Sequence, residues 1–396
     1  MTFEAADKEY RPKFHFTPAK NWMNDPNGLV WHKGEYHLFF QHNPFGREWG
    51  HMSWGHAVSK DLLHWEELPV AIPEEESGAI FSGSAVSVGD EIVAIYTRDK
   101  DKRQTQCIAV SKDNGGTFTK FEGNPVLDLN MEHFRDPKVF AYKDHWIMAL
   151  VKAEEHLVCF YSSTDLKQWT ALSEFGKVGA TGGQWECPDF FPLSIDGEEI
   201  WVLIVSLSPG GIKNTSGIQY FIGDFDGKTF SPRFSTTEPR WLDYGSHNYA
   251  GVTFNNEPNN KRIFMGWLSS WQKKAHAETS WVGAMTIPRE LGLTKVEGEI
   301  VLTQQPICDA MYELKVVAPN SGTVGLQGFV KLGYNADTQS IFIDDYEAPY
   351  KVTDGQLHLK VVVDQSSVEL FTGDGTRCIT LAVFPEPGTS RVLTPY

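Results

Sequence analysis

Three acidic residues stand out because each is followed closely by a proline and each precedes a β-rich run. Asp25 lies in the string WMNDPNG, Asp136 in FRDP and Glu186 in QWECP. Cleavage of a glycosidic bond requires two carboxyl groups, one ionised and one protonated, and a third carboxylate can hold sugar hydroxyls. Each string taken alone also fits an ordinary surface turn. The predicted chemistry therefore depends on whether the fold brings the three acids together.

An internal repeat predicts how they meet. A strand, a turn of the form S-x-D and an aromatic residue recur at Asp61, Asp113 and Asp165, 52 residues apart, with a weaker copy at Asp226. A period near fifty residues with several strands per unit is typical of propeller blades. Four copies and the strand-rich stretch at about 241–295 predict five blades. The alternative is an irregular β-sandwich with chance repeats.

The acids follow the same period. Asp25, Ser82, Asp136 and Glu186 succeed one another at steps of 57, 54 and 50 residues. Equivalent positions on successive blades converge around the central axis, so we expect one small funnel to hold all three acids. Burial and mutual repulsion raise carboxyl pKa values, and the cation of Arg135 is expected to keep Asp136 ionised.

The chain as a whole reads as all-β. Short runs rich in β-branched and aromatic residues are separated by Gly, Asn, Asp and Pro, which is the signature of strands. After Pro288–Gly292 the repeat disappears but alternating strands continue. We predict a five-bladed β-propeller catalytic domain over residues 1–295 and a small, shortened β-sandwich over 296–396.

Composition excludes several classes of protein. The net charge of -16 argues against a nucleic-acid partner, and no apolar run approaches the 18 residues of a membrane span. Neither the five cysteines, which have no CxxC pair, nor the histidines have the spacing of metal ligands, so we expect no metal and no cofactor. The first residues show no signal peptide; the expected protein is soluble, cytoplasmic, or secreted if a leader was removed.

At this point the motifs resemble a known family. The strings WMNDPNG, FFQHNP, WGHAVSKDLLHW, FSGS, FRDPKVF, WECPDFF and IPREL, in this order over about residues 10–295, are similar to those of glycoside hydrolase family 32, the invertase, inulinase and levanase group. VDQSSVELF, at 363–371, resembles its sandwich module. The resemblance implies a five-bladed propeller with a β-sandwich, a retaining mechanism, no metal, and sucrose or a fructan as substrate.

The resemblance also implies roles for individual residues. Asp25 is expected to be the nucleophile, Asp136 the transition-state stabiliser and Glu186 the general acid/base. The expected substrate-binding residues are Asn24, Gln41, Trp49, Phe81, Ser82, Arg135, His247 and Trp267.

Two features depart from the family pattern. His247 stands where the family usually carries an acidic residue, in the segment taken as the fifth blade's equivalent of Glu186. The sandwich, at about 100 residues, is short for the family, and missing strands would expose apolar surface. A homo-oligomer formed through the sandwich is therefore one expected outcome.

Alternatives to hydrolysis remain open from the sequence. A fructosyltransferase would use the same covalent intermediate, and a catalytically inactive fructan-binding propeller would keep the fold without turnover. Arabinan or xylan cleavage fits WMNDPNG and WECP poorly, and a protein-interaction propeller leaves the three acids unexplained. The sequence does not rank sucrose, inulin and levan, although WECPDFF leans weakly towards exo action.

Overall fold

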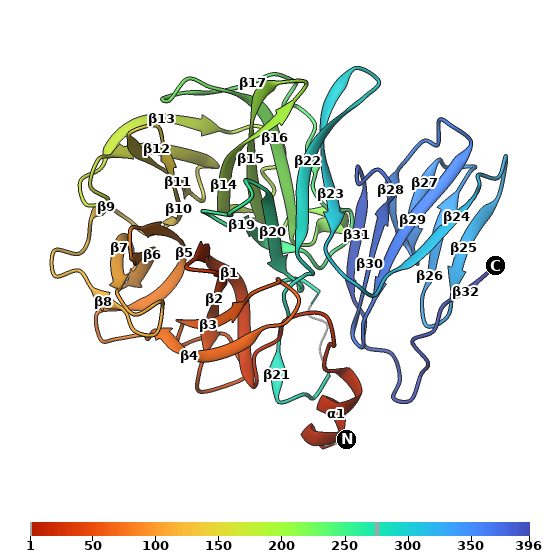
Figure 1. The fold of residues 1–396 in the computed structure, drawn as a ribbon, viewed down its shortest axis with the longest axis horizontal. Helices are drawn as coiled ribbons and strands as arrows, with labels where there is room; N and C mark the ends of the chain where they lie inside the picture. Colours follow the sequence, from red (N-terminus) through yellow and green to blue (C-terminus); the bar gives the residue numbers. More distant parts are fainter. Residues whose placement is uncertain (1, 274–276) are drawn as a thin grey trace.

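The structure is a computed structural model that describes residues 2–273 and 277–396. It is almost entirely β, with one short helix, α1 (Phe3–Tyr10), and a single 3-10 turn, η1 (Ile212–Asn214), among the described residues. None of the helices in this part of the chain has the length and apolar character needed to cross a membrane. Figure 1 shows the sheets of residues 21–306 following one another around the left part of the molecule, with the last β-sheets, in blue, beside them.

Residues 21–306 form five sheets of mainly antiparallel strands, and the first sheet also contains one short parallel strand. The strands are β21 (Trp281–Val282), β1 (Asn21–His32), β2 (Glu35–Asn43), β3 (Ser53–Ser59) and β4 (Glu66–Ile72) in the first sheet; β5 (Ala79–Val88), β6 (Glu91–Lys100), β7 (Arg103–Ser111), β8 (Thr119–Lys120) and β9 (Leu127–Met131) in the second; β10 (Phe134–Tyr142), β11 (His145–Lys152), β12 (Leu157–Ser163) and β13 (Thr170–Gly176) in the third; β14 (Gln184–Ile195), β15 (Glu198–Ser208), β16 (Gly217–Phe225), β17 (Phe230–Pro232) and β18 (Arg240–Trp241) in the fourth; and β19 (Tyr249–Thr253), β20 (Arg262–Trp267), β22 (Arg289–Val296) and β23 (Glu299–Pro306) in the fifth.

Apolar clusters hold each sheet to the next. One cluster joins the first and second sheets through side chains such as Phe39 and Ile92, and others join the second to the third, the third to the fourth and the fourth to the fifth. A further cluster packs Phe40 of the first sheet against Met265 of the fifth. The ring of sheets therefore closes on itself, which buries faces that no single sheet could bury alone.

The turns of the repeat explain why the strands stop where they do. In Ser59–Asp61 the Asp61 carboxylate accepts hydrogen bonds from the backbone N–H groups of Leu63 and His64, at 2.9 and 2.8 Å. Asp165 accepts the equivalent bonds from Lys167 and Gln168. Such Asx turns satisfy backbone donors that the sheet leaves free, so the S-x-D repeat is a turn device.

The remaining strands form two sheets that face each other over one apolar core. The first contains β24 (Tyr312–Val317), β29 (Gln356–Val363), β30 (Ser367–Thr372) and β31 (Cys378–Ala382), and the second contains β28 (Tyr346–Pro349), β27 (Ser340–Ile343), β26 (Lys331–Asn335), β25 (Thr323–Gln327) and β32 (Thr394–Pro395). The predicted all-β architecture, a propeller followed by a sandwich, is confirmed, while the count of five blades stays a prediction.

The predicted domain limit at 295/296 falls inside a hairpin. β23 pairs with β22 along its whole length, from Val296↔Glu299 to Arg289↔Pro306, so the fifth sheet continues to residue 306. The first sandwich strand begins at residue 312. We therefore propose a limit between residues 306 and 312 in place of 295/296.

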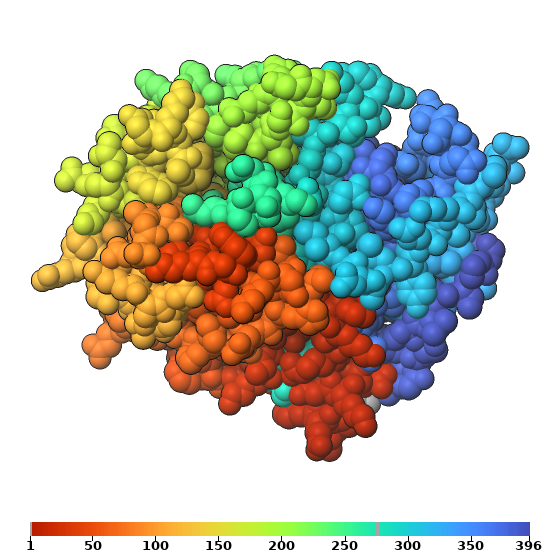
Figure 2. Space-filling view, in the orientation of Figure 1, coloured from red at the N-terminus to blue at the C-terminus, as the bar shows by residue number. Residues whose placement is uncertain are grey.

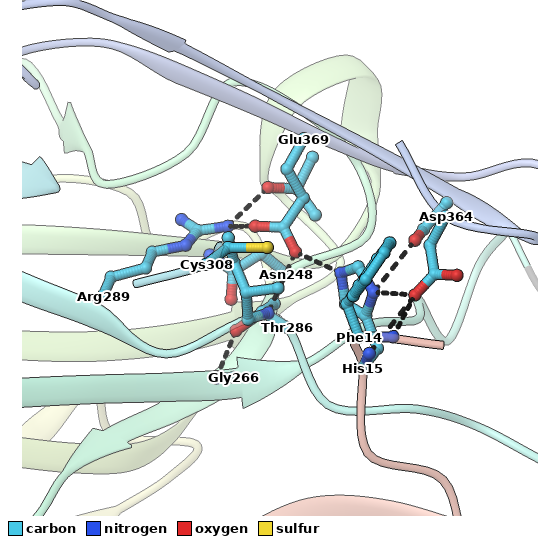
Figure 3. A network of polar contacts seen from close by, with 12 residues as sticks. Phe14, His15, Asn248, Gly266, Thr286, Arg289, Cys308, Asp364 and Glu369 are labelled. Carbon is cyan, nitrogen blue, oxygen red and sulfur yellow. Dashed lines mark hydrogen bonds and ion pairs between the residues drawn. The ribbon is translucent and has the colours of Figure 1, made fainter. Parts of the chain in front are cut away.

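A buried polar network joins the sandwich to the propeller (Figure 3). The Arg289 guanidinium on β22 donates to Glu369 on β30 at 2.6 Å and to Asp243 at 3.2 Å. The Glu369 carboxylate also contacts Nε2 of His15 at 2.8 Å, and Nδ1 of His15 contacts Asp364 at 2.8 Å. All of these side chains are buried, so charges of both signs compensate one another away from water.

The N-terminal segment is the third partner of this interface. Asp364 accepts hydrogen bonds from the backbone N–H groups of Lys13 and Phe14, at 2.7 and 2.8 Å, and the Tyr10 hydroxyl donates to the carbonyl of Pro385. In the space-filling view the red N-terminal residues lie against the dark blue end of the chain (Figure 2). The two ends of the chain thus hold the sandwich in place together.

The His15 contacts predict a pH-dependent stability. Burial lowers the pKa of His15, but the hydrogen bonds to Asp364 and Glu369 outweigh it and raise the pKa to about 9. A raised folded-state pKa stabilises the protein fully below the unfolded value of about 6.5 and progressively less as the pH rises through 9. We expect His15→Gln to lower the free energy of unfolding by on the order of 3 kcal/mol at pH 6.

Chemical unfolding of both proteins at pH 6, 7.5 and 9.5 measures the effect. The difference between wild type and His15→Gln should shrink between pH 6.5 and 9.5. A difference that stays constant over this range would contradict a charged His15.

Candidate active site

The inner strands of the sheets share one irregularity. The pairing of β1, β5, β10 and β14 with the next strand is interrupted between Met23 and Pro26, Ile80 and Gly83, Arg135 and Lys138, and Glu186 and Asp189. β19 has the same interruption between Tyr249 and Val252. A bulge of this kind re-aims side chains out of the strand's regular alternation, and here it does so at the same level in every sheet.

At three of these bulges a non-glycine residue, Asp136, Cys187 or Ala250, has a positive φ angle. Asp136 and Cys187 have φ angles of 64° and 45°, a region that non-glycine residues seldom occupy and that clusters at functional sites. The backbone N–H of Cys187 donates to the Asp136 carboxylate at 2.9 Å. The bulged strands thus fix the neighbouring acid directly.

The side chains at the bulges line one pocket of about 310 Å³. This volume lies at the lower end of the range for small-molecule sites. The structure brings together the three predicted acids and six of the predicted binding residues, and it adds four residues that sequence reasoning missed. The lining consists of Asn24, Asp25, Gln41, Trp49, Phe81, Ser82, Gln104, His133, Arg135, Asp136, Gln184, Glu186 and Trp271.

Asp25 is surrounded by hydrogen-bond donors. The Ser82 hydroxyl donates to its carboxylate at 2.6 Å, the Asn24 amide at 3.1 Å and the Cys187 thiol at 3.4 Å. Burial and the negative charge of Glu186 raise the pKa of Asp25, whereas these three donors oppose the rise. Donors of this kind favour the ionised form and hold the carboxylate in one orientation.

Asp136 is buried beside Arg135. Burial raises the pKa of Asp136 to about 7, and the Arg135 guanidinium, whose Nε lies 3.8 Å from the carboxylate, opposes the rise only in part. The cation of Arg135 thus offsets only part of the effect of burial on the pKa of Asp136.

Glu186 is held from two sides. The Arg135 guanidinium donates to one carboxylate oxygen at 3.1 Å, and the Tyr249 hydroxyl donates to the other. Burial and the Glu186 charge raise the pKa of Tyr249 well above its usual value, so the phenol stays neutral and remains a donor. Tyr249 occupies in the fifth sheet the position before the bulge that Glu186 occupies in the fourth.

Two predicted binding residues lie away from the pocket lining. The ring of His247 is fully buried, with Nδ1 2.8 Å from the Ser246 hydroxyl and Nε2 3.0 Å from the carbonyl oxygen of Lys273. Burial lowers the pKa of His247 to about 4, so it is a neutral structural residue. The family resemblance pointed to His247 as the fifth blade's equivalent of Glu186, whereas the sheet register places that equivalent two residues later, at Tyr249.

Trp267 is also fully buried. Its ring packs against Trp22, at 5.9 Å between centroids, and against Trp271, at 5.0 Å. Trp271 is the member of this group that lines the pocket. Trp267 therefore supports the pocket wall from behind.

The four residues that were missed come from two places. Gln104, His133 and Gln184 surround Arg135: the Gln184 side-chain oxygen accepts from its guanidinium at 2.6 Å and that of Gln104 at 3.3 Å. Gln184 was within a quoted motif but carried no charge to draw attention to it. Trp271 follows β20 in a loop, where no repeat marks its position. Among residues 2–273 and 277–396, no group of three or more His, Cys, Asp or Glu side chains is arranged to hold a metal ion.

Comparison with known proteins decides the family. The model of the glycosyl hydrolases family 32 N-terminal domain matches residues 15–306, and that of the family 32 C-terminal domain matches residues 309–394. The chain belongs to glycosyl hydrolase family 32. It is thus a glycoside hydrolase by family, and the two matched domains meet between residues 306 and 309.

Relatives within glycosyl hydrolase family 32 are similar over nearly the whole chain. A levanase of Bacillus subtilis is 40% identical over an alignment that covers 96% of this chain and 67% of the relative. An extracellular exo-inulinase of Aspergillus ficuum is 36% identical, covering 96% of this chain and 90% of the relative.

Solved structures of the family have the same fold. The exo-inulinase of Aspergillus awamori superposes with a TM-score of 0.86 at 33% identity, covering 96% of this chain and 94% of the other. A fructofuranosidase of Schwanniomyces occidentalis complexed with fructosylnystose has a TM-score of 0.88 at 30% identity, covering 98% and 94%.

The hydrogen bond from Tyr249 to Glu186 can be tested by mutation. We expect Tyr249→Phe to lower kcat/KM by about 2- to 10-fold, because a hydrogen bond contributes roughly 0.5–1.5 kcal/mol. The fold should persist, since the ring that fills the space is retained. Steady-state kinetics with a melting curve measures both quantities, with Tyr161→Phe, a buried tyrosine of the third sheet, as the matched control. Equal kcat/KM for wild type and Tyr249→Phe would show that the contact has no part in turnover.

Proposed function

We propose that this chain is a retaining β-fructofuranosidase that releases terminal β-D-fructofuranosyl residues from sucrose or from inulin- or levan-type fructans. The observation that carries the proposal is the pairing of Asp25 and Glu186 in one pocket with different partners. Donors from Ser82 and Asn24 prepare Asp25 as an anion, whereas Arg135 and Tyr249 orient Glu186. Two carboxyl groups in distinct environments are the requirement for glycoside hydrolysis.

In the first step a carboxylate oxygen of Asp25 attacks C2 of the fructosyl unit. The bond from C2 to the leaving oxygen breaks, and Glu186 gives its proton to that oxygen. In the second step Glu186 takes a proton from water, whose oxygen attacks C2 and breaks the ester with Asp25. Fructose leaves with its configuration retained, and both acids return to their starting states.

The other side chains have supporting roles in this proposal. Asp136 and Arg135 lie against Cys187 and Glu186 and bind fructose hydroxyls, with Asp136 stabilising the transition state. Asn24, Gln41 and Ser82 supply polar contacts, while Trp49 and Phe81 supply apolar ones. Names of relatives support the substrate class, since the family members compared include a levanase, exo-inulinases, an invertase and a β-fructofuranosidase complexed with sucrose. A homo-oligomer and the cellular location stay predictions.

Asp25→Ala should abolish turnover while the melting temperature stays close to that of wild type. Loss of the nucleophile is expected to lower kcat by about 10⁴-fold or more. The control is Asp226→Ala, which removes an exposed turn aspartate that does not line the pocket. Release of fructose from sucrose and inulin measures the effect, and near-normal release by Asp25→Ala would refute the assignment.

Glu186→Ala tests the acid/base role separately. We expect a loss of about 10²- to 10⁴-fold on sucrose, and a smaller loss on p-nitrophenyl β-D-fructofuranoside, whose leaving group needs no proton. Equal losses on the two substrates would argue against general acid catalysis by Glu186.

Product analysis distinguishes the open alternatives. With methanol as a competing acceptor, a retaining enzyme forms methyl β-D-fructofuranoside, and an inverting enzyme forms no β-product. Glucose and fructose in equal amounts as the only products at high sucrose support hydrolysis, and fructose without intermediate oligosaccharides from inulin or levan supports exo action. Net growth of oligosaccharides would instead identify a fructosyltransferase, and binding without any turnover an inactive propeller.

A further inference from the structure

The pocket has an aromatic rim that continues onto the surface. The loop of residues 44–52, between β2 and β3, carries Trp49, which lines the pocket and is 49% exposed. The same loop carries Phe45, which is 78% exposed, the largest value among the exposed large hydrophobic side chains of the described residues. A single exposed apolar ring needs no explanation, but this one lies in the same loop as Trp49, which lines a sugar-sized pocket.

The loop is held by hydrogen bonds along its length. The Asn43 side chain accepts from the Phe45 backbone N–H at 2.9 Å and donates to the Glu48 carbonyl at 2.8 Å. The Asn21 amide donates to the carbonyl of Pro44 at 2.8 Å, and the Trp22 N–H donates to that of Gly46 at 3.0 Å. Because the backbone is fixed on both sides of Phe45, binding a ligand to its ring would order little additional chain, so the entropy cost of binding is small.

Ring contacts order the side chains of the rim. Trp49 packs edge-on against Phe81, which also lines the pocket, at 6.1 Å between centroids. Phe45 packs edge-on against His51 at 5.5 Å and an interplanar angle of 89°. Nδ1 of His51 is in turn held by Glu74 at 2.9 Å. The His51 ring therefore supports the ring of Phe45, and the polar groups of His51 and Glu74 lie beside that contact.

We propose that Phe45, which shares its loop with the pocket-lining Trp49, is a stacking platform for sugar units beyond the scissile bond. The proposed site deepens the β-fructofuranosidase function and rests on it. Sugar rings present C–H faces that pack on aromatic faces, and their hydroxyls bind polar groups such as His51 and Glu74. Sucrose has a single unit after the cleaved bond and does not extend this far. A fructan of three or more units reaches Phe45, which makes it a specificity-determining residue for polymers.

The test compares chain lengths. For Phe45→Ala and wild type, kcat/KM is measured on sucrose, on inulin-type oligofructosides of increasing length, and on levan. We expect the ratio of kcat/KM on the longer substrates to that on sucrose to fall about three- to tenfold in Phe45→Ala, since an aromatic contact contributes roughly 0.5–1.5 kcal/mol. The fall should begin with the trisaccharide and should be largely absent in Phe45→Tyr, which keeps the ring.

The matched control is Tyr312→Ala, because Tyr312 is a 39% exposed ring on the sandwich strand β24. It should leave the ratio as in wild type. An unchanged ratio in Phe45→Ala would overturn the platform, as would the same change in Tyr312→Ala. Light scattering is run alongside: a change in oligomeric state with an unchanged ratio would make Phe45 a contact between copies of this chain and overturn the proposal. Failure of the wild type to cleave any β-fructoside would instead refute the proposed function, and the platform with it.

Discussion

The guanidinium of Arg135 is the one cation that contacts the carboxyl groups of the pocket among the described residues. It lies 3.1 Å from Glu186 and 3.8 Å from Asp136; Gln184 accepts from the same nitrogen as Glu186, and Gln104 accepts from the third nitrogen. Burying several carboxyl groups with one positive charge is unfavourable, and the raised pKa values of Asp25 and Asp136 express this cost. Only a rigid surrounding keeps such a group from rearranging. The closed ring of sheets, with its bulged inner strands, provides that rigidity.

The same principle of paired charges recurs between the domains. Arg289 and His15 face Glu369, and Asp364 and Asp243 complete the set. Here two cations face three carboxylates and every partner is buried, so the network fixes the orientation of the sandwich on the propeller. The network includes Arg289 of β22, which belongs to the fifth sheet. The fifth sheet also supplies Tyr249 to the active site. The sandwich therefore supports the part of the ring that orients Glu186, although it lines none of the pocket.

Much of this arrangement could be predicted from the sequence, because the acidic residues recur at nearly the same spacing as the structural repeat. The S-x-D turns gave the spacing of the sheets, and the acids followed that spacing. What could not be predicted depends on the bulges. A bulge changes which side of the strand the neighbouring side chains face. Asp25 and Asp136 lie inside the interruptions of their strands, whereas Glu186 is the last paired residue before its interruption. The family resemblance pointed to His247, whereas the pairing register leads to Tyr249. Trp271 lies in a loop with no periodic signal, and the helix α1 is too short for helical periodicity to mark it.

One pairing in the first sheet bears on the order in which the protein can be made. β1 carries Asp25, and its outer neighbour on one side is β21, which pairs with it in parallel through Asn21↔Trp281 and Trp22↔Val282. The Ser280 N–H and hydroxyl are in turn bound by Asp7. Synthesis on the ribosome delivers these partners some 260 residues apart. The first sheet of the nascent chain therefore stays unpaired at that edge until almost the whole propeller has been synthesised. A truncated translation product would contain the nucleophile but not a complete pocket.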